Sequence, residues 1–178
     1  SYKWPYIVKL LVNNDIDMTN TNRSKDTVLH SAIFNCHDVL GNDKNENEIL
    51  NTILEKLKEK PETLKKLLET EDFMGYTPIF NVVQYANLKI VEKLFKIISY
   101  FKTLNLNNAQ DMFHSNLLHI AAQNPNQDVF QFVLSKIHIV IDILSPQNCL
   151  LETDRSNNTP LITAIECGQI NIAKAIIE

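Results

Sequence analysis

Apolar residues recur along the chain with the spacing of short amphipathic helices that come in pairs. The later helix of a pair carries apolar residues at positions i, i+1, i+4 and i+5, which is a helical period with one buried face. This spacing is found at Ile90, Val91, Leu94 and Phe95, at Val129, Phe130, Val133 and Leu134, and at Ile172, Ala173, Ile176 and Ile177. The earlier helix is short and includes small residues such as Ala32 and Ala121, against which a neighbouring helix can pack closely. The pattern predicts an all-α chain.

The helical pairs belong to a unit that occurs four times. Its first helix lies in residues 26–33, 76–83, 115–122 and 158–165, and each copy follows a turn-like segment that opens with Asn22, Asp72, Asp111 or Asp154. A turn with two antiparallel helices is too small to bury its own apolar face, whereas stacked copies bury one another's. We therefore predict one domain over residues 1–178, with repeats that start near residues 22, 72, 111 and 154.

Each first helix begins after a residue that is suited to cap it. Side-chain oxygens that can accept hydrogen bonds from first-turn amides are found at Thr27, Thr77, Asn116 and Thr159. Pro78 and Pro160 come next, at the first helical position, where a fixed φ suits the helix and the missing N–H costs nothing. We expect Thr27, Thr77, Asn116 and Thr159 to be N-caps.

In this arrangement the residues resemble the ankyrin repeat, whose pattern is Asp-x-x-Gly-x-Thr-Pro-Leu-His-x-Ala-Ala, then Gly, then a second helix. The matching residues are Thr27, Leu29, His30 and Ala32; Asp72, Gly75, Thr77 and Pro78; Leu118, His119, Ala121 and Ala122; and Asp154, Thr159, Pro160, Leu161, Ala164 and Gly168. The resemblance implies an ankyrin-repeat solenoid of stacked helix-turn-helix units with hairpin-like turns. It also implies that His30 and His119 are structural histidines, which form hydrogen bonds within the turn that joins neighbouring repeats.

The chain departs from this pattern in the length of its repeats. The cap positions lie 50, 39 and 43 residues apart, against about 33 in the usual repeat. We interpret residues 38–46 as an inserted loop, and residues 61–70 and 146–153, which both begin with Pro, as extra short linker helices. Similar lengthened linkers occur in inhibitor-of-NF-kappaB-type ankyrin domains and in many bacterial effector ankyrin proteins. Lys25, His114 and Asn157 occupy the turn position that normally takes Gly.

Both ends of the sequence look incomplete. Residues 7–17 resemble the closing helix and loop of a preceding repeat, so residues 1–21 are interpreted as a partial repeat, and the last repeat is truncated within its second helix at Glu178. We expect a piece of a longer ankyrin-repeat protein. The chain has many Asn and Lys residues and only two Arg residues, a bias typical of an A/T-rich genome such as that of a symbiont or a pathogen.

Composition excludes several classes of function. A net charge of -4 gives no basic surface for a nucleic-acid partner, and no apolar run approaches the ~18 residues of a membrane helix. Three scattered cysteines fit neither a disulfide framework nor a zinc site, and no signal peptide is visible in the first residues. We expect a cytoplasmic protein, in the host cytosol if it is a secreted effector.

The chain shows no catalytic constellation, and we expect no enzyme activity, cofactor or metal in it. Cys36 and His37 lie near His30 without a recognised zinc spacing. The stretch from Asp43 to Leu54 starts like a calcium loop, but it lacks the Gly and the final Glu that such a loop needs.

The turns carry apolar residues where a polar surface is expected, and this is the most informative feature of the sequence. Positions that point from the hairpin tips are normally polar, but here they are Phe73, Met74, Tyr76, Met112 and Phe113. The first and last turns carry polar residues at the same positions. An aromatic and Met cluster with a polar rim is typical of an interface. The alternative is that the long linkers fold back over these side chains, or that they pack on one another.

The resemblance also implies an inner-helix groove beside these turns. Its residues would be Asn81, Gln84, Tyr85, Ile120, Gln123 and Asn124, flanked by Phe34, Asn35, Glu166 and Cys167. We predict a protein–protein interaction module that binds another protein through the hairpin tips and this groove. Two alternatives stay open: the substrate-targeting region of a larger secreted effector enzyme, and an inhibitor-of-NF-kappaB-like cytosolic regulator.

Overall fold

The computed structural model describes residues 16–34, 46–101, 110–139 and 146–178. Most of the predicted partial repeat (residues 1–15), most of the inserted loop (residues 38–45), and Asn35, Cys36 and His37 lie outside the described residues. Four pairs of helices are present in the described part, each preceded by a turn.

The helical pairs follow the predicted order along the chain. The first helices are α2 (Val28–Phe34), α5 (Pro78–Tyr85), α7 (Leu117–Ala121) and α10 (Pro160–Glu166). The second helices are α3 (Glu46–Lys58), α6 (Leu88–Ile98), α8 (Gln127–Lys136) and α11 (Ile170–Ile177), and a short 3-10 helix, η1 (Ile137–Ile139), continues α8.

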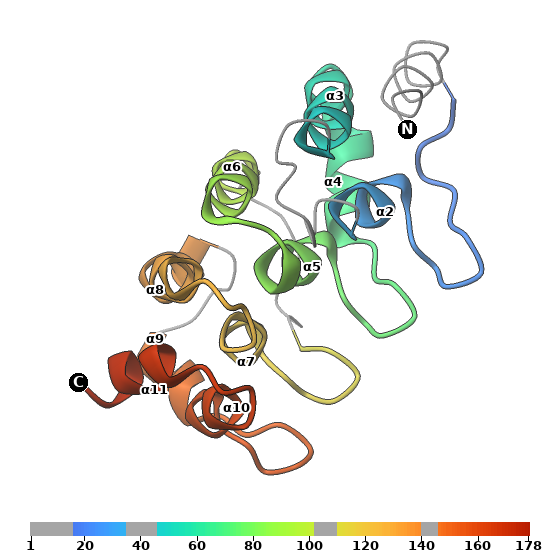
Figure 1. Cartoon of the computed structure of the whole chain (residues 1–178). Coiled ribbons are helices and arrows are strands. Elements are labelled where there is room, and N and C mark those ends of the chain that lie inside the picture. The colour runs from blue at the N-terminus through green and yellow to red at the C-terminus, as the bar shows by residue number, and fades with distance from the viewer. Residues whose placement is uncertain (1–15, 35–45, 102–109, 140–145) are drawn as a thin grey trace.

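The pairs stack into a two-layered array (Figure 1). Helices α2, α5, α7 and α10 form an inner row in which each helix packs on the next, while α6, α8 and α11 pack on one another in an outer row that α3 extends. The four turns project from the same side of the inner row. This is the all-α repeat solenoid that the apolar spacing predicts.

Two further helices lie between repeats, where the sequence shows proline-initiated linkers. Helix α4 (Pro61–Glu69) packs on α3 and α5, and α9 (Pro146–Leu151) packs on α10. Leu64, Leu67 and Leu68 of α4 are buried in the common core. The lengthened linkers therefore add apolar residues to the core of the stack.

The core is built from the helical stripes that the sequence shows. Val91, Leu94, Phe95, Val129, Phe130 and Val133 of the outer row are almost completely buried, together with Ile79, Phe80, Val82, Val83, Leu117, Leu118 and Ile120 of the inner row. Ala121 and Ala122 are fully buried where neighbouring inner helices approach. Burial of these side chains against the next repeat is the main source of stability.

Each turn is a finger held by its first residue. The fingers are residues 22–26, 72–76, 111–115 and 154–158, and we number them 1 to 4. In finger 2 the Asp72 Oδ1 atom accepts hydrogen bonds from the N–H groups of Met74 and Tyr76, at 2.7 and 2.9 Å. Asn22, Asp111 and Asp154 make the same pair of bonds in their fingers, at 2.7–2.9 Å.

The fourth residue of every finger has a left-handed backbone. The φ angles are 60° at Lys25, 80° at Gly75, 62° at His114 and 62° at Asn157. A Cβ at Gly75 would meet the backbone N of Met112 at 3.2 Å, so the finger that keeps glycine is one whose neighbour leaves little room for a side chain. The other three fingers tolerate a side chain at some cost in strain.

Histidine links neighbouring repeats at two of the three junctions. The Thr27 N–H donates to Nδ1 of His30 at 3.2 Å, so Nε2 carries the proton and donates to the Tyr76 carbonyl oxygen at 2.9 Å. His119 repeats this arrangement: Nδ1 accepts from the Asn116 N–H at 3.2 Å, and Nε2 reaches the Asn158 carbonyl at 2.8 Å.

The second repeat lacks this link, and one prediction needs correction there. The family's His position is held by Phe80, which is buried and stacks on Tyr76 with ring centroids 5.6 Å apart. Thr77 precedes α5 as expected, but its side chain makes no capping hydrogen bond. Among the described residues its buried Oγ1 has no hydrogen-bond partner at all. By contrast, Asn116 accepts from the N–H groups of Leu118 and His119.

The two threonines predict opposite responses to the same substitution. Thr77→Val removes a buried hydroxyl that has no partner, so the free energy of unfolding should stay level or rise by up to about 1 kcal/mol. Thr27→Val removes the hydroxyl that lies 2.8 Å from His30 Nδ1. This change should lower the free energy of unfolding by about 1–2 kcal/mol. Urea unfolding followed by circular dichroism measures both, and an equal loss for the two variants would contradict the assignment.

Candidate functional site

The fingers are joined edge to edge by one backbone hydrogen bond at each junction. The N–H of Phe73 donates to the Ser24 carbonyl at 2.8 Å, that of Met112 to the Met74 carbonyl at 3.0 Å, and that of Arg155 to the Phe113 carbonyl at 2.9 Å. In each case the second residue of a finger donates to the third residue of the preceding one. The ladder uses only main-chain atoms, so the side chains at these positions remain available.

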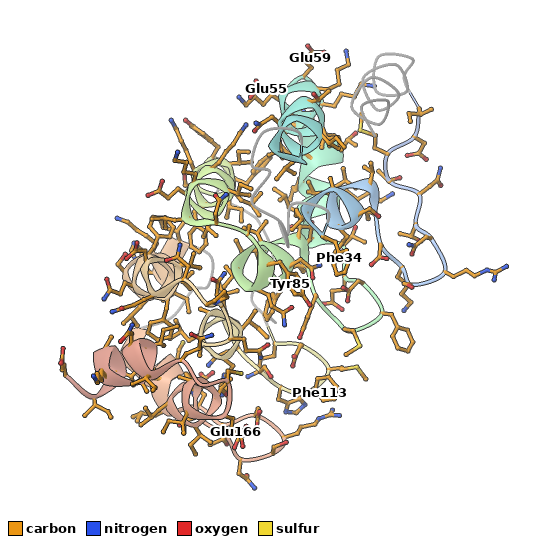
Figure 2. All side chains as sticks on the ribbon, viewed as in Figure 1. Phe34, Glu55, Glu59, Tyr85, Phe113 and Glu166 are labelled. Carbon is orange, nitrogen blue, oxygen red and sulfur yellow. The ribbon has the colours of Figure 1, made fainter. Side chains whose placement is uncertain are left out.

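Three large apolar side chains are exposed on the adjacent fingers 2 and 3. Phe73 is 66 % exposed, Phe113 46 % and Met112 41 %, and Figure 2 shows Phe113 on its finger. No linker in the described part of the chain buries them. We call these three residues the finger patch.

The other two predicted finger residues lie partly inside. Met74 is half-buried, and Tyr76 is half-buried against Phe80. Burial, and then the carboxylate of Asp111, raise the pKa of Tyr76 far above its usual value. Tyr76 is therefore a packing residue more than a residue of the surface.

Polar fingers border the finger patch on both sides. Arg23 and Ser24 of finger 1 and Ser156 of finger 4 are exposed. Arg155 is also exposed and contacts His114, with Nη2 3.3 Å from Nε2. The apolar centre and polar border correspond to the anatomy of many protein interfaces.

The predicted groove residues fall into two groups. Gln84 and Gln123, on adjacent repeats, are half-buried and joined by a hydrogen bond from Nε2 of Gln84 to Oε1 of Gln123 at 2.8 Å. Tyr85 is half-buried next to Phe34, whose ring meets it edge-on with centroids 5.6 Å apart (Figure 2). These residues line the face of the inner row.

Asn124 and Ile120 do not lie on the surface that a partner protein could contact. Asn124 is only 2 % exposed, and its Nδ2 donates to the carbonyl oxygens of Val83 and Ala86 at 2.8 and 3.2 Å. Ile120 is fully buried. The prediction of Asn124 as a contact residue was wrong, because α7 ends at Ala121 and the following turn directs Asn124 back onto the end of α5.

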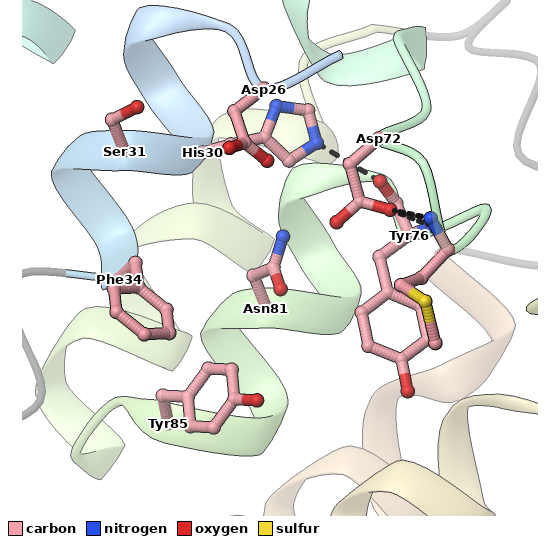
Figure 3. A pocket seen from close by; sticks show the side chains of 9 residues that line it. Asp26, His30, Ser31, Phe34, Asp72, Tyr76, Asn81 and Tyr85 are labelled. Atoms are coloured by element: carbon pink, nitrogen blue, oxygen red, sulfur yellow. Dashed lines mark hydrogen bonds between the residues drawn. The ribbon is translucent and has the colours of Figure 1, made fainter. Parts of the chain in front are cut away.

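A hollow of about 330 Å³ lies between finger 1, finger 2, α2 and α5. The side chains around it include Asp26, Asp72, His30, Phe34, Asn81 and Tyr85 (Figure 3). We call it the α2–α5 pocket. Phe34, Asn81 and Tyr85 were predicted from the sequence for this groove, whereas Asp26 and Asp72 were not.

The pocket is bordered by groups that can accept hydrogen bonds. Asp72 uses Oδ1 to hold its finger, and Asp26 accepts from Nδ2 of Asn22 through Oδ2 at 2.8 Å. Burial, and then the charge of Asp72, raise the pKa of Tyr85, so its hydroxyl stays protonated at neutral pH.

The described residues offer no other kind of site. They contain no group of three or more His, Cys, Asp or Glu side chains that could hold a metal ion. None of their helices has the length and apolar character needed to cross a bilayer. Cys149 is buried and Cys167 exposed, and burial followed by a neighbouring glutamate raises the pKa of each thiol.

The reassignment of Asn124 gives a stability prediction. Asn124→Ala should lower the free energy of unfolding by about 2 kcal/mol, because two carbonyls at the end of α5 lose their buried donor. Gln123→Ala, one residue earlier and half-exposed, should cost less than about 1 kcal/mol. Urea unfolding of the two variants measures the difference. A near-zero effect of Asn124→Ala would return this residue to the candidate surface.

Comparison with known protein families identifies the repeat in the C-terminal part of the chain. The family model for ankyrin repeats (3 copies) matches residues 101–178, which include fingers 3 and 4 with their helical pairs. No curated protein matches the chain. Fingers 1 and 2 have the same side-chain bonds, left-handed residue and finger-to-finger ladder as the matched part. Residues 101–178 match the ankyrin-repeat family, and the helical pairs of fingers 1 and 2 share the architecture of the matched part.

Proposed function

We propose that this chain is a protein-binding module whose partner contacts the finger patch and the adjoining face of the inner helices. Ankyrin repeats generally mediate protein–protein interaction, and ankyrin-repeat domains are typically binding modules without catalytic activity. The observation that carries the proposal is the exposure of Phe73, Met112 and Phe113 on two adjacent fingers. Folding does not require large apolar side chains at these positions, because the fingers are held by backbone and by Asp72 and Asp111.

The exposed residues are of the type that dominates interface energetics. Large aromatic and Met side chains at the centre of an interface, surrounded by polar groups that exclude water, contribute most of the affinity of many complexes. The glutamine pair Gln84–Gln123 extends this surface toward the inner helices with polar groups. The proposed contact residues are therefore Phe73, Met112, Phe113, Gln84 and Gln123, with Met74 and Tyr76 beneath them as support.

The narrower functions remain predictions without an observation of their own. A substrate-targeting region of a larger secreted effector enzyme and an inhibitor-of-NF-kappaB-like regulator would both use an ankyrin surface of this kind. A cytoplasmic location, or one in the host cytosol, belongs with them.

An affinity experiment with matched variants tests the proposal. Three baits are immobilised: the native chain, a finger variant (Phe73→Ser, Met112→Ser, Phe113→Ser), and a control variant (Tyr100→Ser, Ile177→Ser). The control removes exposed apolar side chains outside the fingers. A protein that the native chain and the control retain, and the finger variant loses, would support the proposal. Retention by all three baits would place the binding surface elsewhere.

Single substitutions then give the magnitude with the purified partner. Phe73→Ala and Phe113→Ala should each weaken binding by about 2 kcal/mol, the scale of an interface hot spot. Titration calorimetry measures this, and unfolding curves that match the native chain show that the fold is intact. If neither change alters the affinity, the finger patch is not the binding site.

A further inference from the structure

The α2–α5 pocket holds two carboxylates that no cation of the described residues neutralises. Asp26 and Asp72 face it from fingers 1 and 2. The ion pairs of the described part lie on the outer row, between Lys56 and Glu59, and between Glu55 and both Lys58 and Lys93. Each aspartate uses one oxygen within its own finger, which leaves Asp26 Oδ1 and Asp72 Oδ2 for a ligand.

A buried amide also faces the pocket without a partner. Asn81 is only 7 % exposed and lines the pocket from α5. No hydrogen bond to its side-chain amide is found within the described ranges, and Figure 3 shows it between Asp72 and the Phe34–Tyr85 pair. In the described part, the enclosed side-chain atoms without a partner are Thr77 Oγ1 and Gln84 Oε1, so the Asn81 amide keeps access to solvent at the pocket. A ligand there can take the place of water as its hydrogen-bond partner.

Aromatic side chains form the opposite border of the pocket. Phe34 is largely exposed, and its ring packs edge-on against Tyr85. A partly exposed aromatic pair close to carboxylates is a surface on which a flat cation can stack while it binds acidic oxygens.

We propose that the α2–α5 pocket binds an arginine side chain of the partner protein. The proposal rests on the proposed function, since it names the chemistry of the partner at the inner-helix part of the same surface. The guanidinium lies against Phe34 and Tyr85, donates to Asp26 Oδ1 and Asp72 Oδ2, and meets Oδ1 of Asn81 with a further N–H. The two carboxylates select a positive charge, and no Lys or Arg of the described residues lines the pocket.

The shape and the chemistry favour arginine over the other cations. A guanidinium has five N–H donors in one plane and a weakly hydrated face, which matches acceptors on several sides of a pocket next to aromatic rings. A lysine ammonium is compact and strongly hydrated and gains less from an aromatic border. Two aspartates with one amide are too few oxygen ligands for a calcium site.

Titration with a minimal ligand tests the pocket without the partner. N-acetyl-L-arginine amide is added to the 15N-labelled chain, and two-dimensional NMR spectra are recorded. We expect saturable shifts at the side-chain amide of Asn81 and at the backbone amides of Asp72 and Tyr85, with a dissociation constant on the order of 1 mM. The citrulline analogue has the same shape but no charge and should bind at least about tenfold more weakly.

Variants assign the effect to the two carboxylates. Asp72→Asn keeps the Oδ1 acceptor that holds the finger, and Asp26→Asn keeps its hydrogen bond to Asn22, so both variants should fold. Each should weaken the binding of arginine amide about tenfold. Asp128→Asn removes an exposed carboxylate of α8 outside the pocket and should leave the titration unchanged. Equal binding of citrulline or of N-acetyl-lysine amide, or a full response in both aspartate variants, would overturn the proposal.

The finger variant separates this proposal from the proposed function. Phe73→Ser, Met112→Ser and Phe113→Ser change no residue of the pocket, so arginine amide should bind this variant as it binds the native chain. A partner lost by the finger variant, with no arginine titration in the native chain, would refute the pocket while the binding function stands. Arginine binding by a chain that retains no protein would refute the binding function instead.

Discussion

Stacking is the constraint on which the structure depends, because one helical pair of this chain cannot bury its own apolar residues. Phe80, Val82 and Val83 of α5 are almost completely buried in a stack where α5 packs on α2 of one neighbouring repeat and α7 of the other. The helices are too short for stability by themselves, α7 having only five residues. Every other feature has to preserve the approach of one inner helix to the next, and the small residues Ala121 and Ala122 at that contact reflect this requirement.

The three junctions meet this requirement with different polar bonds. His30 and His119 join the first and the last junctions by a hydrogen bond to the carbonyl of the next finger. At the middle junction Phe80 takes the place of the histidine, and amide side chains join the repeats through Gln84–Gln123 and through Asn124 to the end of α5. Phe80 therefore stacks on Tyr76 of its own repeat, and these amide hydrogen bonds between the repeats lie near the C-terminal end of α5.

The features that depend on local sequence could be predicted, and those that depend on contacts between repeats could not. Apolar spacing, proline and the turn residues locate the helices and fingers because their physics lies within a few residues. Tyr76 looked like a tip residue, but it packs on Phe80 because of the junction's geometry. Asn124 looked like a groove residue until the early end of α7 turned it inward. Asp26 and Asp72 are far apart in the chain, and only the stack brings them to one pocket.

In each finger, the positions that hold the turn differ from the positions whose side chains face outward. Each finger is fixed by one side chain, at its first position, by a left-handed fourth residue and by a main-chain bond to its neighbour. The second and third residues contribute only backbone to that ladder, so the ladder itself places no demand on their side chains. Polar residues there in fingers 1 and 4, and Phe73, Met112 and Phe113 in fingers 2 and 3, are equally compatible with the same turn. Exposed apolar side chains reduce solubility without adding to the core. Folding therefore does not account for three of them on adjacent fingers, whereas the proposed contact with a partner would.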